Sequence, residues 1–375
     1  MRSLARSLVL AAAAFALPLA SALAQLSSPL ELRIPKAPAL ATAEGAAFLA
    51  YELHITNFSP AALTLRRIEV LARDQTLLTL EDSALARALA RPGVSGAMVD
   101  RPRIGGGLRA VAFLWVPVAA AGAPGPLRHR LTLEVGSGDS TRTRVAEGGA
   151  IAPTPDIAVI GPPLRGANWL TANGPSNESG HRRALIPIDG TPAIAQRFAI
   201  DYVQVDSAGR TFSGARETNA NYYAHGEDAL AVMDGVVTAT KDSIPENVPG
   251  PTSRAVPITL ETVGGNYVII DIGGGRYAFY AHLQPGSLRV RTGDRVRRGQ
   301  VLGLVGNSGN STEPHLHFHL ADGTTPLGAE GIPYAHESFE IVGRCRSLLG
   351  GCAATAAEMR RRETPLANVI IRFPQ

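Results

Sequence analysis

A short alternation of histidines and apolar residues constrains the fold more than any other part of the sequence. Residues 314–320 read Pro-His-Leu-His-Phe-His-Leu. Pro314 disfavours a helix that would run in from upstream. The alternation after it has the period of two that a half-buried strand requires. On such a strand His315, His317 and His319 share one face and the apolar residues enter a core. Because neutral imidazole is the commonest metal ligand, this face favours a metal or catalytic site over a solvated polar surface.

Similar alternation earlier in the chain predicts a mostly β protein. Residues 49–56 and 127–135 alternate in this way, and residues 110–118 form an apolar run typical of a central strand. Glycine, proline and serine separate these segments, so residues 26–150 are expected to form a β-sandwich-like accessory domain. Short strands with tight glycine turns predict an antiparallel β-sheet domain over 196–342.

Composition places the remaining boundaries. Residues 151–195 are rich in glycine and proline and are predicted to form a linker and an irregular approach segment. Residues 343–375 are predicted to be a C-terminal extension with a helix over 354–362 and a last strand over 369–373. A short helix is also predicted over 83–90.

The first 24 residues have the features of a secretory signal peptide. Arg2 and Arg6 form a basic start, Leu8–Leu19 is apolar, and residues 22–24 offer a small-x-small cleavage site. The apolar run is short for a membrane span, and no later segment is long and apolar enough to be one. We therefore expect an exported protein, periplasmic or extracellular, without a stable membrane span.

Charge and cysteine content limit the partners and the redox state. The formal charge of +4 falls to 4 − 2 = +2 without Arg2 and Arg6, which is too small to indicate nucleic acid binding. Cys345 and Cys352 lie close together, so a disulfide closing a short loop is expected in an exported chain. The alternative, a two-cysteine metal site, lacks partner ligands nearby.

The histidine-rich strand ends an ordered series of motifs. In order, they are Ala-Val-Met-Asp-Gly-Val-Val (231–237), Gly-Asn-Tyr-Val-Ile-Ile-Asp (265–271), Tyr-Ala-His-Leu (280–283), Gly-Asp-Arg-Val (293–296), Gly-Gln-Val-Leu-Gly (299–303) and Gly-Asn-Ser-Gly (306–309). This series resembles the lysostaphin-type (LytM-like, duplicated hybrid motif) zinc metallopeptidases of bacterial cell walls. The resemblance covers about a third of the chain. It implies a zinc metalloendopeptidase that cuts the peptide cross-links of peptidoglycan.

The resemblance also implies one zinc ion held by His, Asp and His. In the family, an HxxxD motif on a strand supplies the first two ligands, and the second histidine of HxH supplies the last. Asp201, on a strand predicted over 196–202, and His317 match two of these positions. Arg197 stands where the first histidine belongs, and it cannot ligate zinc because its guanidinium stays protonated.

Another histidine is therefore needed to complete the site. His181 is the best candidate, since it lies in the irregular segment that leads to the strand with Asp201 and follows a glycine that lets the backbone fold closely. His225 is the second candidate. The alternative interpretation is a catalytically inactive module that binds the cell wall or activates a hydrolase. The presence of Arg197 at a ligand position favours this alternative.

Roles for the other histidines follow from the resemblance. His315, beside His317, is expected to be the general base that takes a proton from the attacking water. His282 is expected to stabilise the tetrahedral oxyanion. His319 stands where many family members carry glutamate, and two interpretations stay open for it: it orients a metal ligand, or it is a neutral, exposed side chain.

Overall fold

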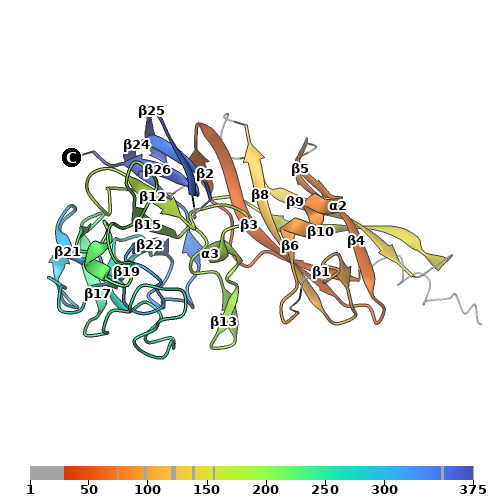
Figure 1. Cartoon of the computed structure of the whole chain (residues 1–375). Helices are drawn as coiled ribbons and strands as arrows, with labels where there is room; N and C mark the ends of the chain where they lie inside the picture. Colours follow the sequence, from red (N-terminus) through yellow and green to blue (C-terminus); the bar gives the residue numbers. More distant parts are fainter. Residues whose placement is uncertain are drawn as a thin grey trace, which may run out of the picture.

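The computed structural model describes residues 29–73, 75–94, 96, 99–119, 124–136, 140–154, 157–347 and 350–374. The signal peptide predicted over 1–24 lies outside these residues. Most strands from the first 150 residues lie at one end of an elongated molecule and the later strands at the other, while β2 (Leu40–Ala43) lies beside β24 (Tyr334–Ser347) where the two parts meet (Figure 1). None of the helices in the described ranges has the length and apolar character needed to cross a membrane.

In the described residues before 152, two five-stranded sheets share one core. The first has the order β1-β3-β8-β6 with β2 on β3, and the second has the order β10-β9-β4-β5 with β7 on β4. Their strands are Leu30–Arg33 (β1), Leu40–Ala43 (β2), Ala46–Asn57 (β3), Leu63–Ala72 (β4), Gln75–Glu81 (β5), Leu89–Ala90 (β6), Arg103–Ile104 (β7), Arg109–Val118 (β8), Leu127–Val135 (β9) and Arg142–Ile151 (β10). Fully buried side chains such as Leu53, Leu65, Leu114 and Leu133 come from both sheets. The mostly β fold class is confirmed, whereas the division into domains stays a prediction.

The short helix predicted over 83–90 is α2, Asp82–Ala88. The two residues after it form β6 and pair with β8.

His129 lies in this core, on β9. Its Nδ1–H donates to the carbonyl of Gly149 (2.9 Å), so its Nε2 accepts from the Tyr51 hydroxyl (2.7 Å). Burial lowers the pKa of His129 to about 4. A second proton would remove the acceptor that Tyr51 uses, so this histidine is structural in its neutral form.

We therefore expect His129 to make the protein less stable in mild acid. Its pKa is about 4 when folded and ~6.5 when unfolded. Its contribution to stability is thus complete above pH ~6.5 and is lost as the pH falls towards 4, by about 1.4 kcal/mol per pH unit. Urea unfolding at pH 7 and pH 5 measures this. His129→Gln, which keeps a donor and an acceptor but does not titrate, should lose less stability over that interval. Equal losses in both proteins would contradict the assignment.

Among the described residues after 157, twelve strands form one sheet. Its order is β11-β24-β26-β12-β15-β22-β19-β18-β17-β20, with β23 on β22 and β25 on β24. The strands are Ala158–Ile160 (β11), Trp169–Ala172 (β12), Ile200–Gln204 (β15), Gly235–Lys241 (β17), Asn266–Asp271 (β18), Tyr277–Leu283 (β19), Arg295–Val296 (β20), Leu316–Ala321 (β22), Gly331–Ile332 (β23), Tyr334–Ser347 (β24), Gly350–Glu363 (β25) and Val369–Arg372 (β26). Two smaller pairs lie beside it, Ile186–Ile188 (β13) with Thr191–Ala193 (β14), and Asp228–Leu230 (β16) with Val301–Leu304 (β21). A large buried apolar cluster supports this sheet.

The segment predicted as a linker contributes two strands to this sheet. β11 pairs in parallel with β24, and β12 pairs with β15 and β26. All four residues of β12 are buried, so the strand has no alternation that could be recognised in the sequence. The strand predicted over 196–202 begins only at Ile200, because residues 196–199 form a turn.

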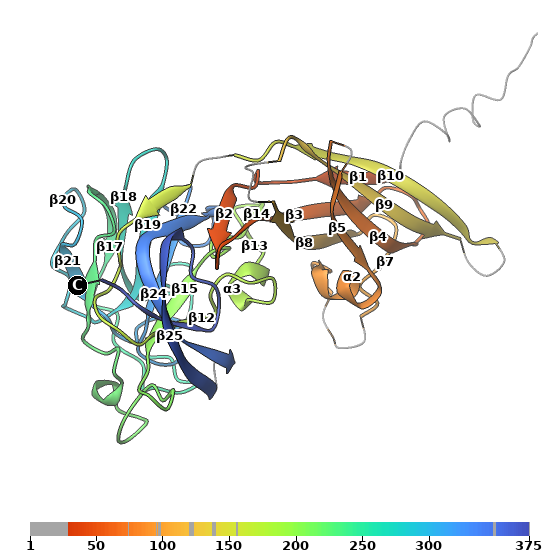
Figure 2. The same ribbon diagram turned by 90° about the horizontal axis from the view of Figure 1, so that it is seen from above.

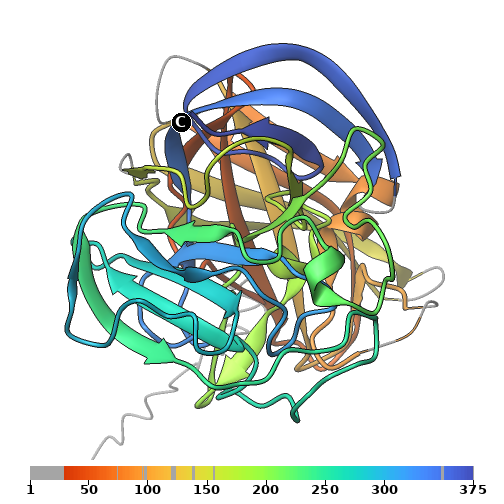
Figure 3. The same cartoon turned by 60° about the vertical axis from the view of Figure 1, so that its left-hand side comes forward.

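The helix predicted over 354–362 is wrong. Those residues lie in β25, which pairs antiparallel with β24 in a long hairpin, seen arching over the sheet in Figure 3. Alanine-rich sequence favours a helix, but cross-strand pairing with β24 outweighs that local preference. The final strand predicted over 369–373 is β26. The predicted boundary at 342/343 falls within β24.

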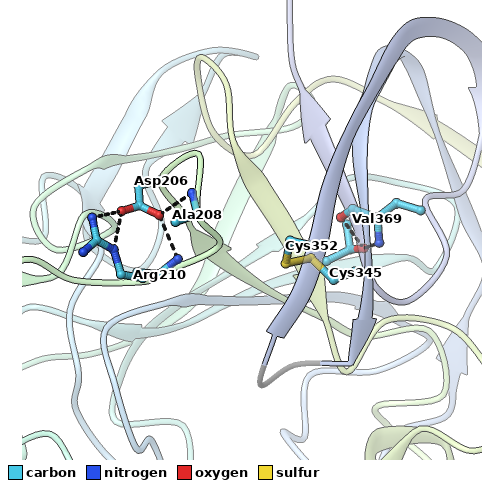
Figure 4. The surroundings of a disulfide bond; sticks show 7 residues. Asp206, Ala208, Arg210, Cys345, Cys352 and Val369 are labelled. Carbon is cyan, nitrogen blue, oxygen red and sulfur yellow. Dashed lines mark hydrogen bonds and ion pairs between the residues drawn. A yellow bond between two sulfur atoms is a disulfide. The ribbon is translucent and has the colours of Figure 1, made fainter.

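The predicted disulfide between Cys345 and Cys352 is present at the end of this hairpin. Figure 4 shows it together with the turn of Asp206, Ala208 and Arg210. An added Cβ at Gly209 would lie 2.8 Å from the Cys352 sulfur, and Gly209 has a φ of +78°. The sulfur therefore packs directly on a turn that follows β15, and only glycine suits that turn.

Candidate metal centre

Neighbouring strands of the twelve-stranded sheet carry most of the predicted site residues. Asp201 on β15 lies opposite His317 on β22 in the strand pairing. The alternation works as predicted, since Leu316, Phe318 and Leu320 are fully buried on the other face. The site thus stands on rigid strands, with β15 and β19 flanking β22.

His181, Asp201 and His317 converge on one point. Their donor atoms all lie within 4.8 Å of one another. His181 Nε2 is 3.4 Å from Asp201 Oδ2, and His317 Nδ1 is 2.8 Å from Asp201 Oδ1. Two imidazoles and one carboxylate are ligands that zinc takes in catalytic sites, where the fourth position stays open. The structure therefore brings together the three residues predicted as ligands, and their chemistry fits zinc.

Asn173 orients two of these three residues and was not predicted. Its carbonyl accepts from His181 Nδ1–H (3.1 Å), which leaves His181 Nε2 facing Asp201. Its side-chain amide donates to Asp201 Oδ2 (2.8 Å). Asn173 has a φ of 47°, as asparagine tolerates better than most residues. In the sequence it stands before Gly174, a dipeptide that indicates only a turn.

Arg197 is committed to an ion-pair network. Its Nε donates to Glu52 Oε2 (2.9 Å) and its Nη2 to Glu330 Oε2 (2.6 Å). Its Nη1 donates to the carbonyl of Gly331 (2.7 Å), and the residue is 4% exposed. The residue that replaces the expected histidine therefore has a structural function of its own.

His225, the second candidate ligand, does not belong to the cluster. Its Nε2 lies 3.1 Å from each carboxylate oxygen of Glu246 and 3.1 Å from the side-chain amide of Gln284.

The predicted general base has a fixed orientation. His315 Nδ1–H donates to the carbonyl of Glu313 (2.8 Å), and its Nε2 lies 3.4 Å from Asp201 Oδ1. Burial alone would lower the pKa of His315, but the Asp201 carboxylate raises it. For Asp201 itself, burial would raise the pKa, but His181 and His315 hold it well below its usual range.

His282 stands beside His315, with ring centroids 4.8 Å apart. Its Nδ1–H donates to the carbonyl of Ser308 (2.8 Å). Burial lowers the pKa of His282 well below its usual range, so its Nε2 is an acceptor while the ring is neutral. Its φ of 66° is left-handed, and a non-glycine residue held there costs about 1–3 kcal/mol, which is typical of functional sites.

His319 is buried, so its interpretation as an exposed histidine is wrong. It is 3% exposed, stacks on Phe279 (4.6 Å between centroids) and has its Nδ1 3.0 Å from His317 Nε2. This contact fixes the ring of a proposed ligand. His319 borders a small pocket of about 30 Å³, lined also by Tyr267, Phe279 and Leu327.

Comparison with known proteins matches part of this chain to a family. Residues 220–328 match the profile of Peptidase family M23. This region is a peptidase family M23 domain. The match includes His282, His315 and His317 but begins after Asp201, so both Asp201 and His181 lie outside it.

Named proteins of three bacteria are similar to short stretches of this chain. Peptidoglycan DD-endopeptidase ShyA of Vibrio cholerae is 43% identical over 73 residues, 19% of this chain and 16% of the relative. Glycyl-glycine endopeptidase ALE-1 of Staphylococcus capitis is 43% identical over 56 residues, 15% of each protein. Lysostaphin of Staphylococcus simulans is 43% identical over 56 residues, 15% of this chain and 11% of the relative. The chain thus spans less than a fifth of the length of each of these relatives.

Solved structures are similar over larger shares of the chain. The catalytic domain of the prophage-encoded M23 protein EnpA from Enterococcus faecalis is 22% identical, with 44% of this chain and 91% of that chain covered and a TM-score of 0.27. A zinc-containing peptidase from Vibrio cholerae is 13% identical, with 81% and 86% covered and a TM-score of 0.26.

Proposed function

We propose that this protein is an exported zinc metalloendopeptidase that hydrolyses the peptide cross-links of bacterial peptidoglycan. The observation that carries the proposal is the convergence of His181, Asp201 and His317 within 4.8 Å, with His315 and His282 beside them. The substrate class rests on the resemblance stated above and on the name of the relative ShyA, a peptidoglycan DD-endopeptidase. Export is supported by the predicted signal peptide and by the disulfide.

The proposed ligands are presented in the forms that a metal needs. Burial lowers the pKa of His181, so its imidazole is neutral and its Nε2 lone pair is available. Asp201 is ionised because its pKa is held well below its usual range by the histidines around it, although burial opposes this. A zinc ion bound here would polarise the scissile carbonyl and lower the pKa of a water molecule.

Two further histidines of the cluster, His315 and His282, have proposed roles in the chemistry. His315, fixed by its bond to the Glu313 carbonyl, would take a proton at Nε2 and pass it to the leaving amine. His282 in its neutral form is an acceptor at Nε2, so the predicted oxyanion role requires a second proton on its ring. Once protonated, it can donate to the oxygen that gains negative charge.

The test of the proposed function is the release of soluble peptides from purified peptidoglycan. We expect the wild-type protein to release peptides, a chelator to stop the release, and added zinc to restore it. Release that a chelator does not change would contradict the metal-dependent mechanism.

A second candidate function is a non-catalytic module that binds the cell wall or activates a hydrolase. The observation that favours it is Arg197, which stands where the resembled family has its first zinc ligand. Protein that binds zinc and peptidoglycan but releases no peptide, under conditions in which a known cross-link peptidase works, would support it.

Asn173 provides a test of how the ligands are oriented. We expect Asn173→Ala to weaken zinc binding by about 10- to 100-fold, because groups that orient ligands typically contribute that much. Competition with a chromophoric chelator measures the Kd. Asn221→Ala is the matched control. The side-chain amide of Asn221 donates to the exposed carbonyl of Ala215 and not to a proposed ligand. Equal affinity in both variants would show that Asn173 does not orient the ligands.

A further inference from the structure

Arg182, the residue after the proposed ligand His181, is anchored in the N-terminal sheet that contains β3 and β8. His181 and Arg182 belong to α3, Gly180–Arg183, which lies between the two parts of the molecule (Figure 2). Arg182 is 1% exposed, and its Nη2 donates to the carbonyls of Tyr51 (3.1 Å) and Leu114 (3.0 Å) on β3 and β8. Its Nη1 lies 3.1 Å from Glu52 Oε1.

The same strand β8 holds the rest of this segment. The guanidinium of Arg183 lies over the ring of Phe113, 4.2 Å from its centroid. Asn177 donates from Nδ2 to the carbonyl of Phe113 (2.9 Å) and accepts at Oδ1 from Arg182 Nε (3.0 Å). Both ends of the segment 177–183, which carries His181, therefore contact the sheet that contains β8.

α3 cannot determine its own position. It has four residues, and Ser179 at its N-cap makes no side-chain capping bond. A helix of one turn has no stability of its own, because nucleation is unfavourable and no propagation follows. The position of the His181 ring thus depends on tertiary contacts: its own bond to the Asn173 carbonyl and the contacts that hold the neighbouring Arg182.

Glu52 connects this segment with the one that carries Asp201. Glu52 is 3% exposed on β3 and contacts Arg182, as described above, as well as Arg197 (Nε to Oε2, 2.9 Å). Arg197 lies in the turn that leads into β15 and to Asp201. Burial would raise the pKa of Glu52, but Arg197 and Arg182 lower it, so the carboxylate is charged. Removing one member of such a buried network leaves an uncompensated charge.

We propose that Glu52 is a positioning residue of the zinc site. By holding Arg182 and Arg197 with one carboxylate, it sets the segments of His181 and Asp201 so that both present donor atoms to the same ion. The inference rests on the zinc site of the proposed function. If Glu52 has this role, the N-terminal sheets are needed for tight zinc binding, in addition to any contact with substrate.

Zinc affinity of the full-length chain tests this inference. The variants are Glu52→Gln, which keeps the shape and removes the charge, and Arg182→Met, which removes the anchor but leaves Glu52 paired with Arg197. Leu133→Ala is the control, because Leu133 is fully buried in the core of the N-terminal sheets on β9 and lies outside the Glu52 network. The readouts are the Kd for zinc, by chelator competition, and urea unfolding of the metal-free proteins.

We expect both network variants to bind zinc about 10- to 100-fold more weakly than wild type, as for other changes outside the ligands themselves. Leu133→Ala should lose stability but, while folded, bind zinc like wild type. Folded Arg182→Met with wild-type affinity would overturn the inference, even if Glu52→Gln fails to fold. So would an equal loss of affinity in Leu133→Ala. Wild-type protein that binds no zinc would overturn the proposed function as well, which separates the two failures.

Discussion

Replacing His181 with alanine is expected to remove zinc as completely as replacing His317. Both residues are assigned as ligands, since their donor atoms and an oxygen of Asp201 lie within 4.8 Å of one another. Loss of one of three protein ligands should cost more than the ~100-fold typical of groups that only orient a ligand. Peptide release should disappear with the metal, because the chemistry depends on it. Metal analysis of the purified variants after dialysis measures the loss.

His225→Ala is the matched control for this prediction. It makes the same side-chain change in a histidine that pairs with Glu246 and lies outside the cluster. The control should retain one zinc per chain. A His181→Ala protein that still binds one zinc tightly would show that His181 does not supply the ligand missing at position 197. Another residue would then have to be the third ligand.

Replacing His315 with alanine should have a different effect, because His315 is assigned as the base and not as a ligand. Zinc and the fold should remain, while the rate of peptide release falls by roughly 10²–10⁴-fold, the usual contribution of positioned proton transfer. The orientation of the ring supports this assignment, since its Nδ1–H is bonded to the Glu313 carbonyl and its Nε2 faces the cluster.

Zinc content and peptide release of His315→Ala, measured together, decide this prediction. His225→Ala again serves as the histidine-to-alanine control and should keep full activity. A His315→Ala variant as active as wild type would exclude the residue as the base. Loss of zinc in this variant would instead make His315 a ligand.

Local pattern was sufficient to predict the part of the site that lies on strands. The alternation around His317 placed three histidines on one face and three apolar residues in the core, and the structure has this arrangement. The chemistry of Arg197 excluded it as a ligand, and the glycine before His181 indicated a segment able to fold closely. The pairing of Cys345 with Cys352 was predicted from their spacing and the expected export.

Contacts between distant segments could not be predicted in this way. Glu52 and Arg197 are 145 positions apart, so no local pattern connects them. Asn173 acts through its own carbonyl and amide, in a sequence context that indicates a turn. The error at 354–362 has the same origin, because alanine favours a helix locally while the partner strand β24 determines the structure. Burial of His319 likewise depends on stacking with Phe279.

The most direct test of the central claim is anomalous diffraction at the zinc edge from crystals of the full-length protein purified without added metal. We expect one zinc per chain, bound by His181 Nε2, an oxygen of Asp201 and His317 Nδ1, with Arg197 still paired with Glu52. A chain without zinc at this position, or a zinc ion bound without His181, would contradict it.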